Sequence, residues 1–135
     1  MALMTWSGKY SVGVEALDNQ HKAMLKVLNE LHAAAMRGKA QEVADHLMSQ
    51  MDAISKEHFS AEERLMESIR FPGLDCHRAK HQELGGKLEE FTSRHQMSDA
   101  SMYVPLLYFV RDWLTKHMQT DDQAYASWLR SHRAQ

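Results

Sequence analysis

The sequence has few of the residues that cross-link chains or interrupt helices. Its 135 residues include one cysteine, Cys76, two prolines and six glycines. One cysteine excludes an internal disulfide and fits a reducing compartment, so we expect a cytoplasmic location. The first residues, MALMTWSGKY, lack the apolar stretch of a secretory signal peptide, and none is expected. No apolar run approaches the ~20 residues that a membrane-spanning helix needs, so no membrane span is expected.

An excess of charge of either sign is also missing. Lysine and arginine total 16 against 18 acidic residues, which gives a net charge of -2. This balance provides neither the basic surface that nucleic acid requires nor a polybasic membrane patch. The length suits one domain. We expect an N-terminal arm over residues 1–17, a helical bundle over about 18–119 and a C-terminal tail over about 120–135.

The scarce helix breakers separate stretches of helical periodicity. Asp18 is predicted to cap the first helix at its N-terminus, and Gly38 to end it in a left-handed conformation. The run Phe71-Pro72-Gly73 stops the second helix. The predicted helices span about residues 19–37, 40–69 and 74–96, with a fourth that begins between Ser101 and Val104.

Short connections between these helices determine the expected topology. Loops of a few residues force neighbouring helices to run antiparallel. The sequence therefore predicts an all-α protein, an antiparallel up-down-up-down four-helix bundle. An irregular N-terminal arm precedes the bundle, and a short C-terminal helix follows it.

Polar side chains that bind metals stand where core residues are due. His58 and Glu62 interrupt the apolar stripe of the second helix, one turn apart on one face. A buried glutamate is costly unless it is paired or bound to a metal. The third and fourth helices show the same substitution of core residues. The full candidate set is His21, His58, Glu62, His77, His81, His117 and Asp122.

The order of the helices brings this candidate set together. Its members occur at the start of the first helix, the end of the second, the start of the third and the end of the fourth. In an up-down-up-down bundle these four positions share one end. A single histidine on an apolar face is more often an ordinary core residue than a ligand, but the joint pattern favours a metal centre.

The number and kind of ligands indicate two ions. Zinc prefers four ligands, so seven suggest a pair of metals. Five imidazoles and two carboxylates suit iron, while zinc, copper and manganese are alternatives. With both carboxylates and an oxo or hydroxo group as bridges, one ion is six-coordinate and the other five-coordinate. The open position would accept a small diatomic ligand.

The last carboxylate has two candidates. Regular helical spacing favours Asp121, four residues after His117. Asp122 lies five residues after His117 and three before Tyr125, and it would face the centre only if the helix distorts or ends there.

The motifs resemble those of the hemerythrins, in particular the single-domain bacterial members. The matching segments cover nearly the whole chain. The family spacing favours Asp122 as the bridge. The family usually has isoleucine after the last histidine, where this chain has Met118. The matching segments are Trp6, Ser11-Val12-Gly13-Val14, Leu17-Asp18-Asn19-Gln20-His21, His58-Phe59-x-x-Glu62-Glu63, Phe71-Pro72-Gly73, His77-x3-His81 and Trp113-Leu114-x-x-His117-x4-Asp122-x-x-Tyr125.

The resemblance implies a non-haem di-iron centre that binds O2 reversibly, for storage, delivery or scavenging. His77, His81 and His117 would hold the six-coordinate iron, and His21 and His58 the O2-binding iron. The implied bridges are Glu62 and Asp122, and the implied O2 pocket is lined by Phe59, Leu114 and Met118.

Two other functions use the same centre. One is an enzyme that consumes peroxide or nitric oxide, which would need a general acid over the open position; the three pocket residues are apolar. The other is an O2 or redox sensor that signals through a partner protein, because the chain has no room for a second domain. We therefore expect a binding protein and not an enzyme.

Overall fold

The structure, a computed structural model, describes residues 2–132. Residue 1 of the expected arm and residues 133–135 of the expected tail lie outside the described residues. Within the described part there are five α-helices and no strand. The helices are α1 (Glu15–Met36), α2 (Ala40–Ser68), α3 (Leu74–Gln96), α4 (Tyr103–Lys116) and α5 (Asp122–His132).

Three short helical turns complete the chain. The 3₁₀ turn η1 (Gly8–Tyr10) lies in the arm, and the 3₁₀ turn η2 (Ala100–Met102) leads into α4. The π-helical turn η3 (His117–Asp121) joins α4 to α5 without a loop. The C-terminal helix is therefore a continuation of the fourth bundle helix and not a separate tail.

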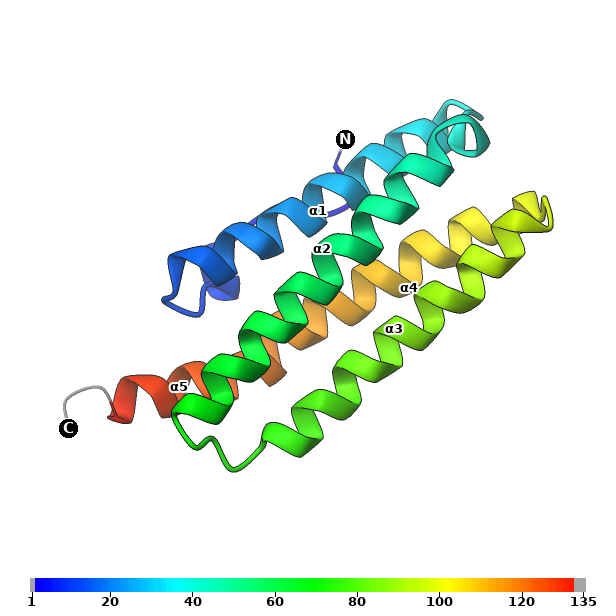
Figure 1. Cartoon of the computed structure of the whole chain (residues 1–135). Coiled ribbons are helices and arrows are strands. Elements are labelled where there is room, and N and C mark those ends of the chain that lie inside the picture. Colours follow the sequence, from blue (N-terminus) through cyan, green and yellow to red (C-terminus); the bar gives the residue numbers. More distant parts are fainter. Residues whose placement is uncertain (1, 133–135) are drawn as a thin grey trace.

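The helices form an antiparallel four-helix bundle, as predicted (Figure 1). Helix α1 packs against α2 and α4, and α3 packs against the same two helices. The start of α1, the end of α2, the start of α3 and the end of α4 lie at one end of the bundle (Figure 1). The topology thus brings the ends that carry the candidate ligands together. No helix of the described part is long and apolar enough to cross a membrane.

The beginning of the first helix differs from the prediction. Helix α1 begins at Glu15, so Asp18 lies in its first turn and is not the cap. The Asp18 carboxylate instead accepts hydrogen bonds from the Ser11 hydroxyl at 2.6 Å and the Val12 amide at 2.9 Å. Gly13, at φ 76°, lets the arm turn back toward the carboxylate. Asp18 therefore holds the arm against the end of the bundle where the ligands gather.

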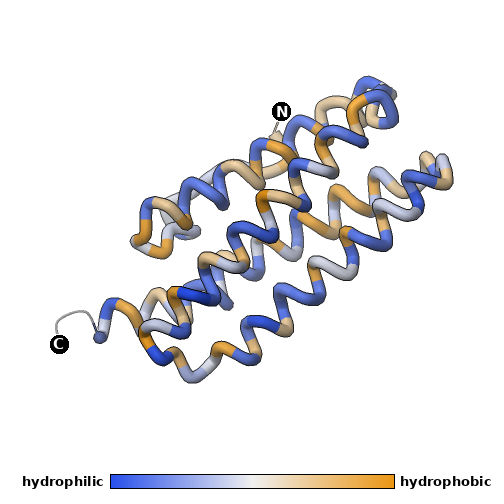
Figure 2. Tube along the Cα trace, in the orientation of Figure 1, coloured by the Kyte–Doolittle hydropathy of each residue, from blue (hydrophilic) through white to orange (hydrophobic). Residues whose placement is uncertain are grey.

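The other helix boundaries follow the sequence closely. Gly38 has φ 70°, the left-handed conformation that ends α1 as expected. Hydrophilic and hydrophobic residues alternate in short stretches along the helices (Figure 2), which is the pattern of a bundle with one buried stripe per helix. Leu28, Leu84 and Leu107 are among the fully buried residues of this core.

Candidate metal centre

All seven candidate ligands lie in the interior at one end of the bundle. Their exposed fractions are between 0 and 4%. Helix α1 contributes one, α2 two, α3 two, and the segment from η3 to the start of α5 two. Polar groups are buried this deeply only when other groups satisfy them. The structure thus brings together every residue of the predicted set.

Four of these side chains form one compact group around Glu62. The Oε1 atom of Glu62 lies 3.1 Å from Nε2 of His81, 3.6 Å from that of His77 and 3.8 Å from that of His117. The ligating atoms of the four residues lie within 4.8 Å of one another. One carboxylate oxygen and three imidazole nitrogens at this spacing can surround a single transition-metal ion.

A second group shares Glu62 and lies toward α1. Its members are Glu62, His21, His58 and Asp122, and their ligating atoms also lie within 4.8 Å of one another. Oδ2 of Asp122 is 3.1 Å from Nε2 of His21, and Oε1 of Glu62 is 3.3 Å from Nε2 of His58. Oδ1 of Asp122 turns the other way, 3.0 Å from Nε2 of His117. Both carboxylates thus reach both groups.

Hydrogen bonds account for only some of these contacts, such as that between Nε2 of His81 and Oε1 of Glu62 at 3.1 Å. Nε2 of His77 and both oxygens of Asp122 are buried and have no well-directed hydrogen bond within the described chain, although the closest of these atoms lie 3.1 Å apart. Buried polar atoms seldom lack partners. Their convergence on a common centre without hydrogen bonds is the arrangement expected of ligands around an ion. The donor set therefore fits a pair of transition metals.

The π-helical turn gives the two aspartates different positions. It adds a residue to the turn after His117, so that Asp122, five residues on, lies inside the bundle and is fully buried. Asp121 stays outside, where its Oδ2 accepts from Nδ1 of the same histidine at 3.0 Å. The distortion expected from the family spacing is present. The two aspartates contact opposite nitrogens of one imidazole.

An outer ring of acceptors holds the histidines from behind. Nδ1 of His58 is 2.7 Å from Oε1 of Gln20, and Nδ1 of His81 is 2.7 Å from Oε2 of Glu63. Together with Asp121, these residues accept Nδ1–H and leave the Nε2 lone pairs directed inward, as metal-binding histidines require. Sequence analysis did not identify this ring.

Glu63 also contributes to the surroundings of the centre. A glutamate on a helix usually lies on a solvated face, but only 26% of the Glu63 side chain is exposed. Besides holding His81, it accepts from Nε of Arg78 at 3.1 Å. The position of Glu63 directly after Glu62 could have indicated this role. Two successive residues of α2 can both contact α3 when the axis of α3 lies between the directions in which their side chains point.

Tyr125 orients one of the carboxylates. Its hydroxyl donates to Oε2 of Glu62 at 2.5 Å, and both groups are fully buried. Burial and the nearby carboxylates raise the pKa of Tyr125, so the hydroxyl remains a donor. Oε1 of Glu62 is thereby left to face the imidazoles.

Neighbouring groups of opposite charge favour a protonated His117 and an ionised Glu62. Burial opposes the charged form of His117, but Asp122, Asp121 and Glu62 outweigh it and raise its pKa to about 11. Burial likewise disfavours the Glu62 anion, yet His58, His117 and His77 lower its pKa well below the usual range. A proton on His117 thus occupies a site that a cation would fill.

Aromatic and apolar residues close the centre on the core side. The expected pocket residues Phe59, Leu114 and Met118 are all buried and belong to one apolar cluster. The Phe59 ring stacks on His81, with centroids 4.0 Å apart and planes 9° apart. Trp113 stacks on His117 with centroids 4.3 Å apart, a contact that the sequence did not indicate. Water is thus kept from this side of the centre.

Residues 12–129 match the hemerythrin HHE cation binding domain, and the chain therefore belongs to the hemerythrin family. It is 31% identical to the bacteriohemerythrin of Methylococcus capsulatus, over 96% of this chain and 98% of that protein. Its identity to the bacteriohemerythrin of Stenotrophomonas maltophilia is also 31%, over 98% of this chain and 85% of that protein.

A solved structure and a further relative agree with this assignment. The crystal structure of a wild-type hemerythrin superimposes with a TM-score of 0.82 at 27% identity, over 95% of this chain and 98% of that one. The myohemerythrin of Riftia pachyptila is 28% identical over 89% of this chain and 88% of its own length. The family resemblance and the fold inferred from the sequence are confirmed.

Proposed function

We propose that this chain binds O2 reversibly at a non-haem di-iron centre, for oxygen storage, delivery or scavenging. The observation that carries the proposal is the pair of four-residue groups that share Glu62 at one end of the bundle. Membership of the hemerythrin family and likeness to bacteriohemerythrins and a myohemerythrin support it.

In this proposal each iron would have its own histidines. His77, His81 and His117 would hold one iron, and His21 and His58 would hold the other, at which O2 would bind. Glu62 and Asp122 would serve both irons, because their oxygens face both groups. An oxo or hydroxo bridge would complete the pair.

When bound, the iron pair would supply both the electrons and the open coordination position that O2 requires. The residues of the chain contribute geometry and exclusion of water. Gln20, Glu63 and Asp121 fix the orientation of three imidazoles. Phe59, Leu114 and Met118 line the O2 pocket, and their apolar side chains have no proton to donate to a bound ligand. This lining supports a binding protein over an enzyme that acts on peroxide.

We also propose a cytoplasmic location. The single cysteine, Cys76, is exposed and unpaired. An exposed free thiol persists most readily in a reducing compartment.

Metal analysis and optical spectra test the proposed function. The protein reconstituted without oxygen should hold two irons per chain, and its spectrum should change reversibly as O2 is added and removed. Glu62→Ala should lose both properties, whereas Glu57→Ala, an exposed position on the same helix, should keep them. One metal per chain, a preference for zinc, or no reversible spectral change would contradict the proposal.

A further inference from the structure

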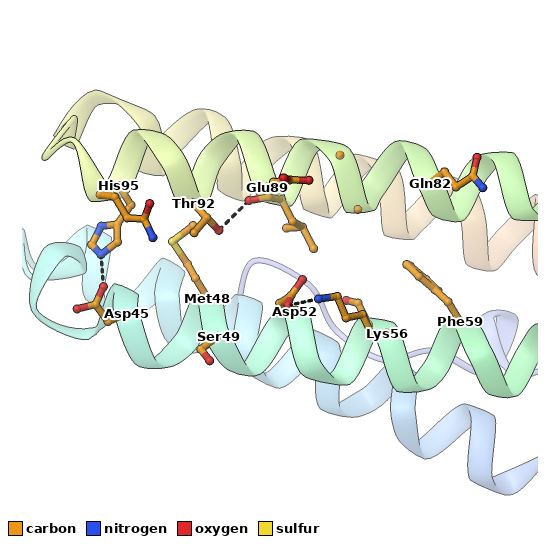
Figure 3. A pocket seen from close by; sticks show the side chains of 15 residues that line it. Asp45, Met48, Ser49, Asp52, Lys56, Phe59, Gln82, Glu89, Thr92 and His95 are labelled. Atoms are coloured by element: carbon orange, nitrogen blue, oxygen red, sulfur yellow. Dashed lines mark hydrogen bonds and ion pairs between the residues drawn. The ribbon is translucent and has the colours of Figure 1, made fainter.

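A groove of about 850 Å³ runs along the interface between α2 and α3 (Figure 3). At one end Asp45 of α2 is hydrogen-bonded to His95 of α3. At the other end Phe59 rises from α2 toward α3, beside Gln82 (Figure 3). The groove therefore leads from the end of the bundle opposite the metal centre to the aromatic ring of Phe59, which packs on His81.

Two consecutive glycines keep the α3 wall of the groove open. Gly85 and Gly86 both line it, and a Cβ atom added at either would meet no heavy atom within 4 Å. Glycine weakens a helix interior relative to alanine. The two glycines thus lower the stability of α3 relative to alanine, and they leave free the space that larger side chains would fill.

A buried hydroxyl indicates what fills the groove. Ser55 is only 2% exposed and lines the groove on the α2 side. Its Oγ atom has no hydrogen-bond partner among the described residues. A buried hydroxyl is normally satisfied, and the groove has room for water beside it. Ser55 lies one turn before Phe59 on α2, so a water bound to its hydroxyl would lie near that ring.

Phe59 both lines the inner end of the groove and packs near three candidate ligands. One face of its ring lies on His81, and its centroid is 6.1 Å from that of His58 and 6.5 Å from that of His117. The ring itself is 8% exposed. The Phe59 side chain is thus common to the groove and to the surroundings of the imidazoles.

We propose that the α2–α3 groove is the path by which O2 reaches and leaves the metal centre, with Phe59 as its inner barrier. The inference rests on the proposed O2-binding function. O2 is small and uncharged, so it can diffuse through the water of a polar groove without being held by the charged walls. A path of this kind controls how fast O2 binds and departs, and it leaves the equilibrium affinity to the centre itself.

Filling the groove provides the test. In Gly86→Phe the new ring projects into the open space of the groove, and Gly85→Phe is a second variant of the same design. Gly86→Ala is the matched control, because it restores helix propensity without blocking the groove. Stopped-flow mixing of the reduced iron protein with O2 measures association, and trapping of released O2 measures dissociation.

In both phenylalanine variants the two rate constants should fall together by about tenfold, which corresponds to an added barrier of about 1.4 kcal/mol. Their ratio, the affinity, should not change, and Gly86→Ala should behave as the parent. Unchanged rates in both phenylalanine variants, or an equal loss in Gly86→Ala, would overturn the proposal. A parent protein without iron or O2 binding would instead refute the proposed function.

A structural measurement gives an independent readout. A crystal structure of the iron protein should show an ordered water on Oγ of Ser55, and that water should be displaced in Gly86→Phe. A Ser55 hydroxyl bonded directly to the protein, with no water in the groove, would overturn the proposal.

Discussion

Replacing Glu63 by alanine should weaken iron binding, although Glu63 is not among the candidate ligands. The carboxylate holds Nδ1 of His81 at 2.7 Å and so keeps Nε2 directed at the centre. Loss of such an outer partner typically lowers metal affinity by about 10- to 100-fold. Because Glu63 is 26% exposed and also shared with Arg78, we expect the lower figure, about tenfold, or about 1.4 kcal/mol.

Matched variants isolate the cause of this loss. Glu63→Gln keeps an acceptor and loses the charge, so its affinity should be intermediate. Glu67→Ala removes a neighbouring carboxylate that is 72% exposed and 4.0 Å from Arg78, and it should resemble the parent. Arg78→Ala breaks the ion pair but leaves the bond to His81, so it should also retain iron.

Competition with a chelator, followed by the absorbance of the remaining iron centre, measures the affinities. Unfolding by denaturant in each variant separates loss of iron from loss of folded protein. Equal iron affinities in Glu63→Ala and Glu67→Ala would refute the reasoning, because the bond to His81 would then contribute nothing to the centre.

Three further predictions concern the segment from His117 to Asp122. Asp122→Asn should lose most of the iron, whereas Asp121→Asn should bind it about tenfold more weakly, since Asp121 only holds His117; iron-to-protein ratios measure this, and the reverse order would contradict the placement of the two aspartates. Met118→Ile should give slower autoxidation of the oxygenated form at unchanged iron content, because a branched side chain is less flexible and cannot be oxidised as methionine can. The decay of the oxygenated spectrum measures this, and an equal or faster decay in the isoleucine variant would show that residue 118 does not control the lifetime of bound O2. Metal uptake at neutral pH should release at least one proton. The raised pKa of His117, about 11, keeps this side chain protonated before metal binds, and a histidine ligand must be neutral. Calorimetry in buffers of different ionisation enthalpy measures the protons released, and a value of zero would contradict this prediction.

Much of the fold follows from the sequence because apolar periodicity and helix breakers act locally. The predicted third helix, 74–96, coincides with α3, and the predicted second helix differs from α2 by one residue at its end. The beginning of α1 could not be located in this way. Asp18 has the chemistry of a cap, but its partners are amide and hydroxyl groups of the arm, and only the turn at Gly13 brings them within reach.

Most of the candidate ligands were accessible to sequence analysis because they interrupt apolar stripes, whereas Asp122 was placed by the family spacing. Their outer partners were not accessible, because they lie between the buried and exposed faces. Whether Glu63 points to solvent or to His81 depends on how α2 and α3 are rotated about their axes. Likewise, helical spacing correctly placed Asp121 beside His117, but on the outer nitrogen of the ring.

The π-helical turn has a consequence for everything that follows it in the chain. Successive residues of a helix differ by about 100° in direction, so the extra residue rotates α5 by that angle relative to an uninterrupted α4. Asp122, Tyr125 and Leu129, at i, i+3 and i+7, face inward as a result. Loss of this π-helical turn with the sequence unchanged would turn Asp122 away from the histidines and Tyr125 away from Glu62 in a single step. The centre therefore depends on the winding of one helical turn as well as on the identities of its residues.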